Sequence, residues 1–338
     1  MSAGGPSFAH LVRLSDDTGL HEHACGPLPR REHGYCLDDV ARGLIVLCRE
    51  PALPAHLVVL VERYLAFTAH AQSTDGRFHN RLGSDRRWRD EPGLGDWWGR
   101  ALWGLGTAAA RCPLPWIRAA ALARFEASAH HRPPSVRSMA FAALGAAEVL
   151  REVPDHALAT KLLGDVATYV GEPRHAPDWP WPEARLFYAN AVLPEALIAA
   201  GDLLGNLKVR DDGLRLLDWL LTVESRNGHL SPTPTGGWGA GEPRPAFDQQ
   251  PIEVAALADA CARAYLVTAD HVWLTGVRRA VAWFEGDNDL RVPLLDGETH
   301  GGRDGLGPGG PNLNQGAEST LALISTLQHR RTLLEAVG

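Results

Sequence analysis

The sequence predicts an all-α protein of the (α/α)6 toroid class, a closed ring of six inner and six outer helices. Six Ala/Leu-rich runs each follow a polar or Gly/Pro-rich loop. Amphipathic helical segments lie between these runs, and strand signals such as sustained alternation or Val/Ile/Thr clusters are sparse. One ring of this kind uses the whole chain, so we expect a single domain over residues 1–338.

The inner helices are predicted from runs that are apolar or small nearly all round, as a helix buried on both sides requires. Their spacing of roughly 40 to 65 residues is too long for a tight solenoid and suits a helical hairpin with a long loop. The six runs begin near Asp38, Asp96, Ser135, Glu183, Gln250 and Asn314.

The outer helices are predicted from segments whose apolar residues recur at three- and four-residue intervals, with charged residues between them. Five such segments cover residues 56–70, 114–131, 155–170, 211–225 and 271–284. The sixth outer helix must be short, and either residues 7–14 or the C-terminal residues 330–338 supply it. A helix this short survives only by packing.

Composition and motifs exclude several classes of function. The net charge is −7 with dispersed basic residues, which argues against nucleic acid or an anionic membrane as partner. The chain has no apolar stretch long enough to span a bilayer and no signal-peptide pattern, and its five cysteines form no CxxC pair. We therefore expect a cytoplasmic protein with reduced thiols. Because no nucleotide, zinc or EF-hand spacing is present, we expect no cofactor or metal.

Carboxylates and tryptophans are concentrated at the starts of the predicted inner helices. In such a ring the inner helices run parallel, so their N-termini and the preceding loops converge on one face. Sugar C–H faces stack on indole rings, sugar hydroxyls bind carboxylates, and glycosidic cleavage needs one acid and one base. The pattern indicates a carbohydrate-active enzyme, and a glycoside hydrolase acting on an oligosaccharide or glycoconjugate is the function we expect.

The catalytic candidates are Asp39, Glu183 and Asp248. We expect Asp38 to cap the first inner helix and Asp39 to face the bowl, where the helix dipole favours an ionised base or nucleophile. Glu183 lies beside Trp181 and two prolines, an apolar setting that suits an acid with a raised pKa. Asp248 has no helical role and is the other candidate partner. The predicted substrate-binding residues are Trp88, Asp96, Trp97, Trp98, Trp179, Trp181, His229, Trp238, Gln250 and Glu318.

Two other functions fit the same ring. A sugar epimerase would use a pair of histidines as acid and base, with His79, His229 and His300 as the loop candidates. A non-catalytic toroid would bind glycans without cleaving them. Two carboxylates close together favour hydrolysis, and two histidines around one point favour epimerisation. Convergence of aromatic rings and arginines alone favours binding.

Motifs along nearly the whole chain resemble an uncharacterised bacterial family of (α/α)6 proteins, often joined behind a glycosyltransferase domain. They are HLVRLSDDTGLHEHA, GYCLDDVARGL, DRRWRDEPGLGDWWGRALWGLG, GHLSPTPTGGWG, FDQQPIEVAAL, NDLRVPLLDGETHGGRDGL and NQGAESTLALI. The chain is also distantly similar to the six-hairpin glycosidase superfamily. The resemblance implies a carbohydrate setting and a glycosyltransferase as a candidate partner.

The chain departs from the pattern of that family at two places. DDVAR stands where the relatives have DDNAR, and GDWWGRALW stands where they have EDSHGRALW. If the polar residues of the relatives bind substrate, this protein has either a changed specificity or a lost activity.

Overall fold

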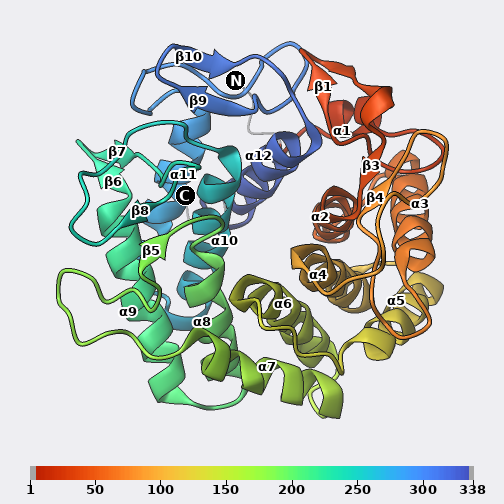
Figure 1. The fold of residues 1–338 in the computed structure, drawn as a ribbon, viewed down its shortest axis with the longest axis horizontal. Coiled ribbons are helices and arrows are strands. Elements are labelled where there is room, and N and C mark those ends of the chain that lie inside the picture. Colours follow the sequence, from red (N-terminus) through yellow and green to blue (C-terminus); the bar gives the residue numbers. More distant parts are fainter. Residues whose placement is uncertain (1–4, 335–338) are drawn as a thin grey trace.

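The structure, a computed structural model, describes residues 5–334 and confirms the predicted (α/α)6 toroid (Figure 1). Six helices form an inner ring in which each contacts the next, and contact between the last and the first closes the ring. These inner helices are α2 (Leu37–Cys48), α4 (Asp96–Arg111), α6 (Val136–Glu152), α8 (Val192–Leu203), α10 (Pro251–Thr268) and α12 (Ala317–His329).

The outer helices alternate with the inner ones along the chain. They are α1 (Ala9–Leu14), α3 (Ala55–Ala71), α5 (Pro115–Ser128), α7 (Ala157–Val170), α9 (Leu207–Val223) and α11 (Val272–Glu285). The short sixth helix is α1, which packs against α12, so the prediction for residues 7–14 is confirmed. The alternative segment instead continues α12 as a π-helical turn, Arg330–Leu334, and residues 335–338 lie outside the described part of the chain.

One predicted helix start and one predicted helix cap are wrong. The fourth inner helix begins at Val192 and not near Glu183, because β5 (Arg185–Leu186) pairs with β8 (Trp238–Gly239) and keeps this segment extended. Asp38 does not cap α2, because the N-cap position is Cys36 and its side chain makes no capping hydrogen bond. The chain enters α2 directly from β3 (Tyr35–Cys36), which pairs with β4 (Arg81–Leu82).

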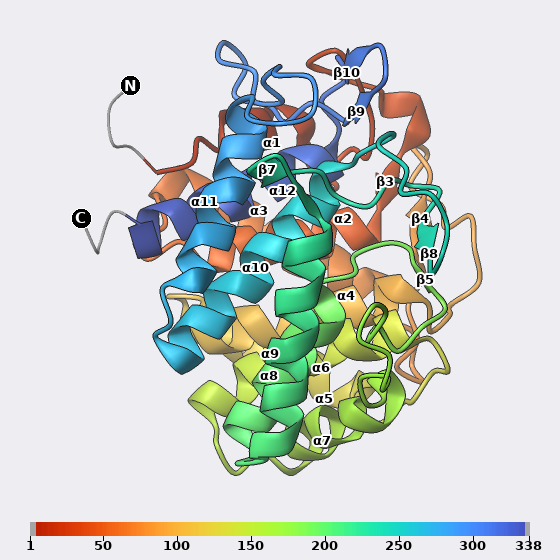
Figure 2. The ribbon, with the colours of Figure 1, turned by 90° about the vertical axis from the view of Figure 1, so that its left-hand side faces the viewer.

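Five short two-stranded sheets lie in the loops that precede the inner helices in the described part of the chain. Besides the pairs above, β1 (Ala24–Cys25) pairs with β2 (Leu28–Pro29), β6 (Ser225–Arg226) with β7 (His229–Leu230), and β9 (Gly305–Gly307) with β10 (Gly310–Asn312). Figure 2 shows β3, β4, β5 and β8 together at one side of the ring. These loops therefore build a rim at the N-terminal ends of the inner helices.

Among the described helices, none is both long enough and apolar enough to cross a bilayer.

Glycines allow the inner helices α4 and α6 to pack in close contact. A Cβ atom added to Gly106 would lie 2.2 Å from the carbonyl oxygen of Gly145, and one added to Gly145 would lie 2.3 Å from that of Leu102. A Cβ atom on Gly99 would lie 2.2 Å from the carbonyl oxygen of Ser138. Each glycine costs helix propensity, but the backbones can approach only because the side chains are missing.

We predict that Gly145→Ala lowers the melting temperature, because the added methyl group must displace the backbone of α4 at a cost of about 1–3 kcal/mol. Gly164→Ala on outer helix α7 is the matched control, since its Cβ atom would meet only Leu204 Cδ1 at 3.6 Å. That variant should be neutral or stabilised by up to about 1 kcal/mol through helix propensity. Equal melting temperatures for the two variants would contradict the close packing.

Candidate active site

A cavity of about 520 Å³ opens at the N-terminal ends of α2, α10 and α12. This volume is within the range of roughly 300–1,000 Å³ typical of small-molecule sites. Its charged and polar lining includes five carboxylates from separate parts of the chain. The lining residues used below are Glu22, His23, Cys36, Asp38, Asp39, Arg42, Arg81, Tyr188, Gln250, Asp304, Glu318 and Ser319.

Arg42 lies at the centre of the site and binds two of these carboxylates. Its Nη1 atom is 2.5 Å from Oδ1 of Asp39, three residues earlier on α2. Its Nη2 atom is 2.7 Å from Oε2 of Glu318 on α12 and also donates a hydrogen bond of 3.0 Å to Tyr188 Oη. One guanidinium group therefore joins the first and last inner helices and holds two acids beside each other.

Asp39 is buried, with only 3% of its surface exposed, whereas the Glu318 side chain is 35% exposed. Burial raises the pKa of Asp39 to about 7, and the positive charge of Arg42 only partly opposes this shift. This upward shift in pKa contradicts the expectation that Asp39 stays fully ionised. Near neutral pH this carboxyl group can carry a proton.

Asp38 interacts with side chains from neighbouring elements. Its Oδ1 atom lies 3.4 Å from Arg100 Nε on α4, and its Oδ2 atom accepts a hydrogen bond of 3.3 Å from Asn80 Nδ2. Arg100 also donates from Nη2 to Tyr188 Oη, the atom that Arg42 contacts. Two arginines thus fix the tyrosine at the wall of the cavity.

Glu22, Cys36 and Asp39 are the described residues that could best share a metal ion, since their ligand atoms lie within 4.8 Å of one another. Both carboxylates are already bound by arginines, Glu22 by Arg81 and Asp39 by Arg42. Burial raises the pKa of Cys36 well above its usual value, and the thiol donates to Asn80 Oδ1 at 3.4 Å. The carboxylates and the thiol are therefore better suited to their present partners than to a metal.

The structure places the other two catalytic candidates outside the cavity lining. Glu183 forms a bidentate ion pair with Arg137, at 2.8 and 2.9 Å, and accepts a hydrogen bond of 3.3 Å from Trp181 Nε1. Asp248 is exposed in the loop before α10, and its backbone oxygen accepts from Thr235 N. Neither carboxylate lines the cavity that contains Asp39.

The predicted ring of tryptophans around the bowl is wrong. Among the described residues, no tryptophan lines the cavity. Trp98 and Trp181 are fully buried, and Trp179 packs edge-on against Trp238 and the helix residue Trp219, each at 5.2 Å between ring centroids. Trp98, Trp179 and Trp181 therefore belong to the core, and Trp219 and Trp238 pack against it while partly exposed.

Hydrogen bonds from the indole N–H groups explain why these tryptophans occur in the rim loops or next to them. Trp97 donates to the Phe78 carbonyl at 2.8 Å, Trp179 to the Glu183 carbonyl at 3.0 Å and Trp238 to the Glu242 carbonyl at 2.9 Å. Trp88 stacks on His79, with ring centroids 4.8 Å apart. Each of these side chains stabilises a rim loop. The aromatic residues near the helix starts therefore contribute to the fold.

Of the four remaining predicted binding residues, two line the cavity and two do not. Gln250 and Glu318 line the cavity. Asp96 instead accepts hydrogen bonds of 3.2 and 2.7 Å from the hydroxyl groups of Ser135 and Ser138 on the next inner helix. His229 is buried, with Nε2 3.1 Å from Asp289 Oδ1.

The histidines do not form a pair in the cavity. His23 lines it, whereas His79 packs against Trp88 and its Nδ1 atom lies 2.6 Å from the Asp90 carbonyl oxygen. His300 is exposed in a loop with a positive φ of 60°. His229 is paired with Asp289 and also lies outside the lining. His23 is therefore the one histidine in the described cavity lining.

The site residues predicted from the sequence do not include Arg42, Tyr188, Glu22, Arg81 and Asp304. Arg42 could have been found, because it follows Asp39 by three residues on a predicted helix and so shares its face. Asp304 accepts from Gly316 N at 2.7 Å and from Ser319 Oγ at 2.8 Å, and so holds the start of α12. Loop residues such as Glu22 and Asp304 carry no periodic signal, so only the folded rim shows their position.

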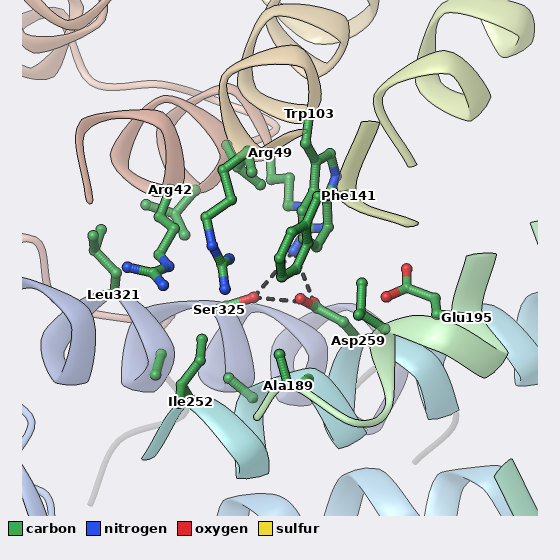
Figure 3. A pocket seen from close by; sticks show the side chains of 17 residues that line it. Arg42, Arg49, Trp103, Phe141, Ala189, Glu195, Ile252, Asp259, Leu321 and Ser325 are labelled. Carbon is green, nitrogen blue, oxygen red and sulfur yellow. Dashed lines mark hydrogen bonds and ion pairs between the residues drawn. The ribbon is translucent and has the colours of Figure 1, made fainter. Parts of the chain in front are cut away.

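Behind the cavity, a narrow void of about 50 Å³ runs between the inner helices (Figure 3). Arg42 lines both spaces. Apolar side chains form most of the wall, and Arg49, Asp259 and Ser325 form a hydrogen-bonded group, with Arg49 Nη1 2.8 Å from Asp259 Oδ1. The void is large enough for a few water molecules but too small for a sugar.

No family model matches the chain, and no curated protein matches it. Solved structures with the same fold include a sugar epimerase from a ruminal bacterium, with a TM-score of 0.72, 11% sequence identity, and coverage of 96% of this chain and 95% of that chain. Cellobiose 2-epimerase from Bacillus thermoamylovorans gives a TM-score of 0.72 at 10% identity, with coverage of 96% and 95%. The GH76 α-mannanase of Bacteroides thetaiotaomicron gives 0.65 at 11% identity, with coverage of 97% and 94%. These likenesses establish the (α/α)6 fold.

The raised pKa of Asp39 predicts a pH-dependent effect on stability. Its ordinary value is 3.8 and its folded value is about 7, so the unfolded chain releases this proton first as the pH rises. Asp39 therefore lowers the stability of the fold progressively between about pH 4 and pH 7. The Asp39→Asn variant lacks this contribution. The difference between the two melting temperatures, variant minus wild type, should therefore become more positive as the pH rises from about 4 to about 7.

Asp248→Asn is the control, because this exposed side chain lies outside the cavity. Its melting temperature, measured over the same pH range, gives the baseline for a carboxylate removed outside the cavity. A constant difference for Asp39→Asn would show that Asp39 titrates normally.

Proposed function

We propose that the protein is a glycoside hydrolase that acts on an oligosaccharide or glycoconjugate in the 520 Å³ cavity. Two carboxylates, Asp39 and Glu318, held in one cavity by a single guanidinium group, support this proposal most directly. Glycosidic cleavage needs such a pair, one protonated and one ionised. The fold shared with carbohydrate enzymes is consistent with it.

In the proposed reaction Asp39 is the general acid, the reverse of the role expected from the sequence. Its proton passes to the glycosidic oxygen as the bond between that oxygen and the anomeric carbon breaks. Glu318, which is more exposed and paired with Arg42, acts at the anomeric carbon, either directly or by taking a proton from water. Arg42 positions both acids.

The other cavity groups suit sugar binding. The Tyr188 oxygen receives hydrogen bonds from two arginines, so its own proton is free to be donated to a substrate oxygen. Gln250 offers an amide, and sugar hydroxyls accept from and donate to such groups. Without a tryptophan platform, recognition in this cavity rests on polar contacts.

Epimerisation of a sugar is the second candidate, because sugar epimerases and a cellobiose 2-epimerase share the fold. It would need two acid–base groups on either side of one carbon. His23 is the single histidine in the described cavity lining, so a carboxylate would have to replace the second. The excess of carboxylates favours hydrolysis. A glycan-binding role without chemistry is the outcome expected if the carboxylates prove dispensable.

We also infer the cellular setting from the sequence. The five cysteines are free thiols, which is consistent with the reducing conditions of the cytoplasm. The resemblance to proteins joined to glycosyltransferases supports such an enzyme as a partner that makes or extends the substrate glycan.

The assignment predicts that Asp39→Asn and Glu318→Gln each reduce kcat by about 10²–10⁴-fold on a substrate identified by screening purified protein against oligosaccharides. Both variants keep the shape of the side chain, so substrate affinity should change much less than kcat. Glu183→Gln and Asp248→Asn, outside the cavity, should keep near wild-type activity.

Product analysis by chromatography and mass spectrometry measures these rates. Full activity of Asp39→Asn would refute the acid assignment. Loss of activity in Glu183→Gln but not in Glu318→Gln would move the site to the Arg137 side of the bowl.

A further inference from the structure

A second cavity, of about 250 Å³, lies at the C-terminal ends of the inner helices, opposite the candidate active site. Its charged lining holds five arginines, three carboxylates and His329, and the carboxylate of Asp259 is already bound by Arg49 and His329. The residues that matter here are Arg111 at the end of α4, Glu148 and Arg151 near the end of α6, Glu195 on α8 and Arg263 on α10.

The arginines of this cavity have more N–H groups than the nearby carboxylates use. Arg111 binds Glu148 through Nε and Nη2, at 2.6 and 3.1 Å. Arg263 is 6% exposed and uses only Nε, which donates to Glu195 Oε1 at 3.0 Å. Its two terminal nitrogens form no hydrogen bond or ion pair with the described residues. A buried guanidinium therefore presents unused donors in a cavity.

Arg151 adds a positive charge without a partner. Its side chain forms no hydrogen bond or ion pair within residues 5–334. Partial burial and the nearby positive charges of Arg263 and Arg111 lower its pKa, although Glu148 and Asp202 oppose this effect. The three arginines line one cavity, and an anion bound there would be attracted by all three positive charges.

Helix dipoles explain only part of this arrangement. Cations are favoured at helix C-termini, which accounts for Arg111 and Arg151 in the last turns of α4 and α6. Arg263 lies well before the last turn of α10. Its unused terminal nitrogens therefore need a different explanation.

We propose that this cavity binds a phosphate-type oxyanion through Arg151 and Arg263, with Arg111 completing the site. Guanidinium groups match the tetrahedral oxygens of phosphate in geometry and charge. The ligand is either free phosphate or a phosphate group on a small metabolite. The site is independent of the proposed hydrolase function, because Glu318 and Asp39 lie at the other end of the ring.

Calorimetric titration of the full chain in low-salt, phosphate-free buffer tests the site, with inorganic phosphate, pyrophosphate and glucose 6-phosphate as separate probes. We expect saturable binding with one site per chain for at least one probe. The tightest probe distinguishes a free oxyanion from a phosphate carried on a sugar. Arg151→Gln should weaken binding at least about tenfold, and Arg151→Glu should abolish it.

Arg278→Gln on outer helix α11 is the matched control, since Arg278 is also exposed but lies outside this cavity. It should bind like the wild type. Melting curves of the Arg151 variants in the absence of ligand show whether the fold is kept, which the exposed side chain leads us to expect. No saturable binding of any probe, or wild-type affinity in both Arg151 variants, would overturn the proposal.

Discussion

The interaction of Arg42 with Asp39 and Glu318 is the contact on which the candidate site depends. It crosses the junction between α2 and α12, the first and last inner helices, so the two acids meet only when the ring is closed. Asp39 and Arg42 are buried, whereas the Glu318 side chain is partly exposed to the cavity. Loss of one partner of a buried pair typically costs about 3–5 kcal/mol, because a charge remains uncompensated. The candidate site therefore forms only when α2 and α12 come together and close the ring.

The parallel direction of the inner helices gives the ring two electrostatic ends. Helix N-termini carry partial positive charge and C-termini partial negative charge. The carboxylates Asp38, Asp39 and Glu318 lie in first turns at the mouth, whereas Arg111 and Arg151 lie in last turns at the base. The same arrangement brings acids together where we propose hydrolysis and arginines together where we propose anion binding. At Asp39, however, burial raises the pKa.

The fold could be predicted from the sequence because helix periodicity and burial on both sides are local patterns that recur six times. The site could be predicted only in part. Asp39, Gln250 and Glu318 line the cavity. They could be predicted because the starts of the inner helices can be recognised in the sequence. Glu183 and the loop tryptophans do not line the cavity, because their positions follow from strand pairing and from indole hydrogen bonds to backbone carbonyls. The strand pairing and the bond from Trp97 to Phe78 join residues far apart in the chain, and none of these contacts leaves a periodic signal.

The central claim, that the protein hydrolyses a glycosidic bond, is tested most directly by isotope labelling of the reaction. Purified protein is incubated with a panel of oligosaccharides in water enriched in ¹⁸O and, in parallel, in deuterium oxide. The masses of the products are then measured by mass spectrometry. Hydrolysis predicts two shorter sugars, one carrying a single ¹⁸O atom at its anomeric carbon. An isomer of unchanged length that gains deuterium at carbon, without cleavage, would contradict the account and establish epimerisation.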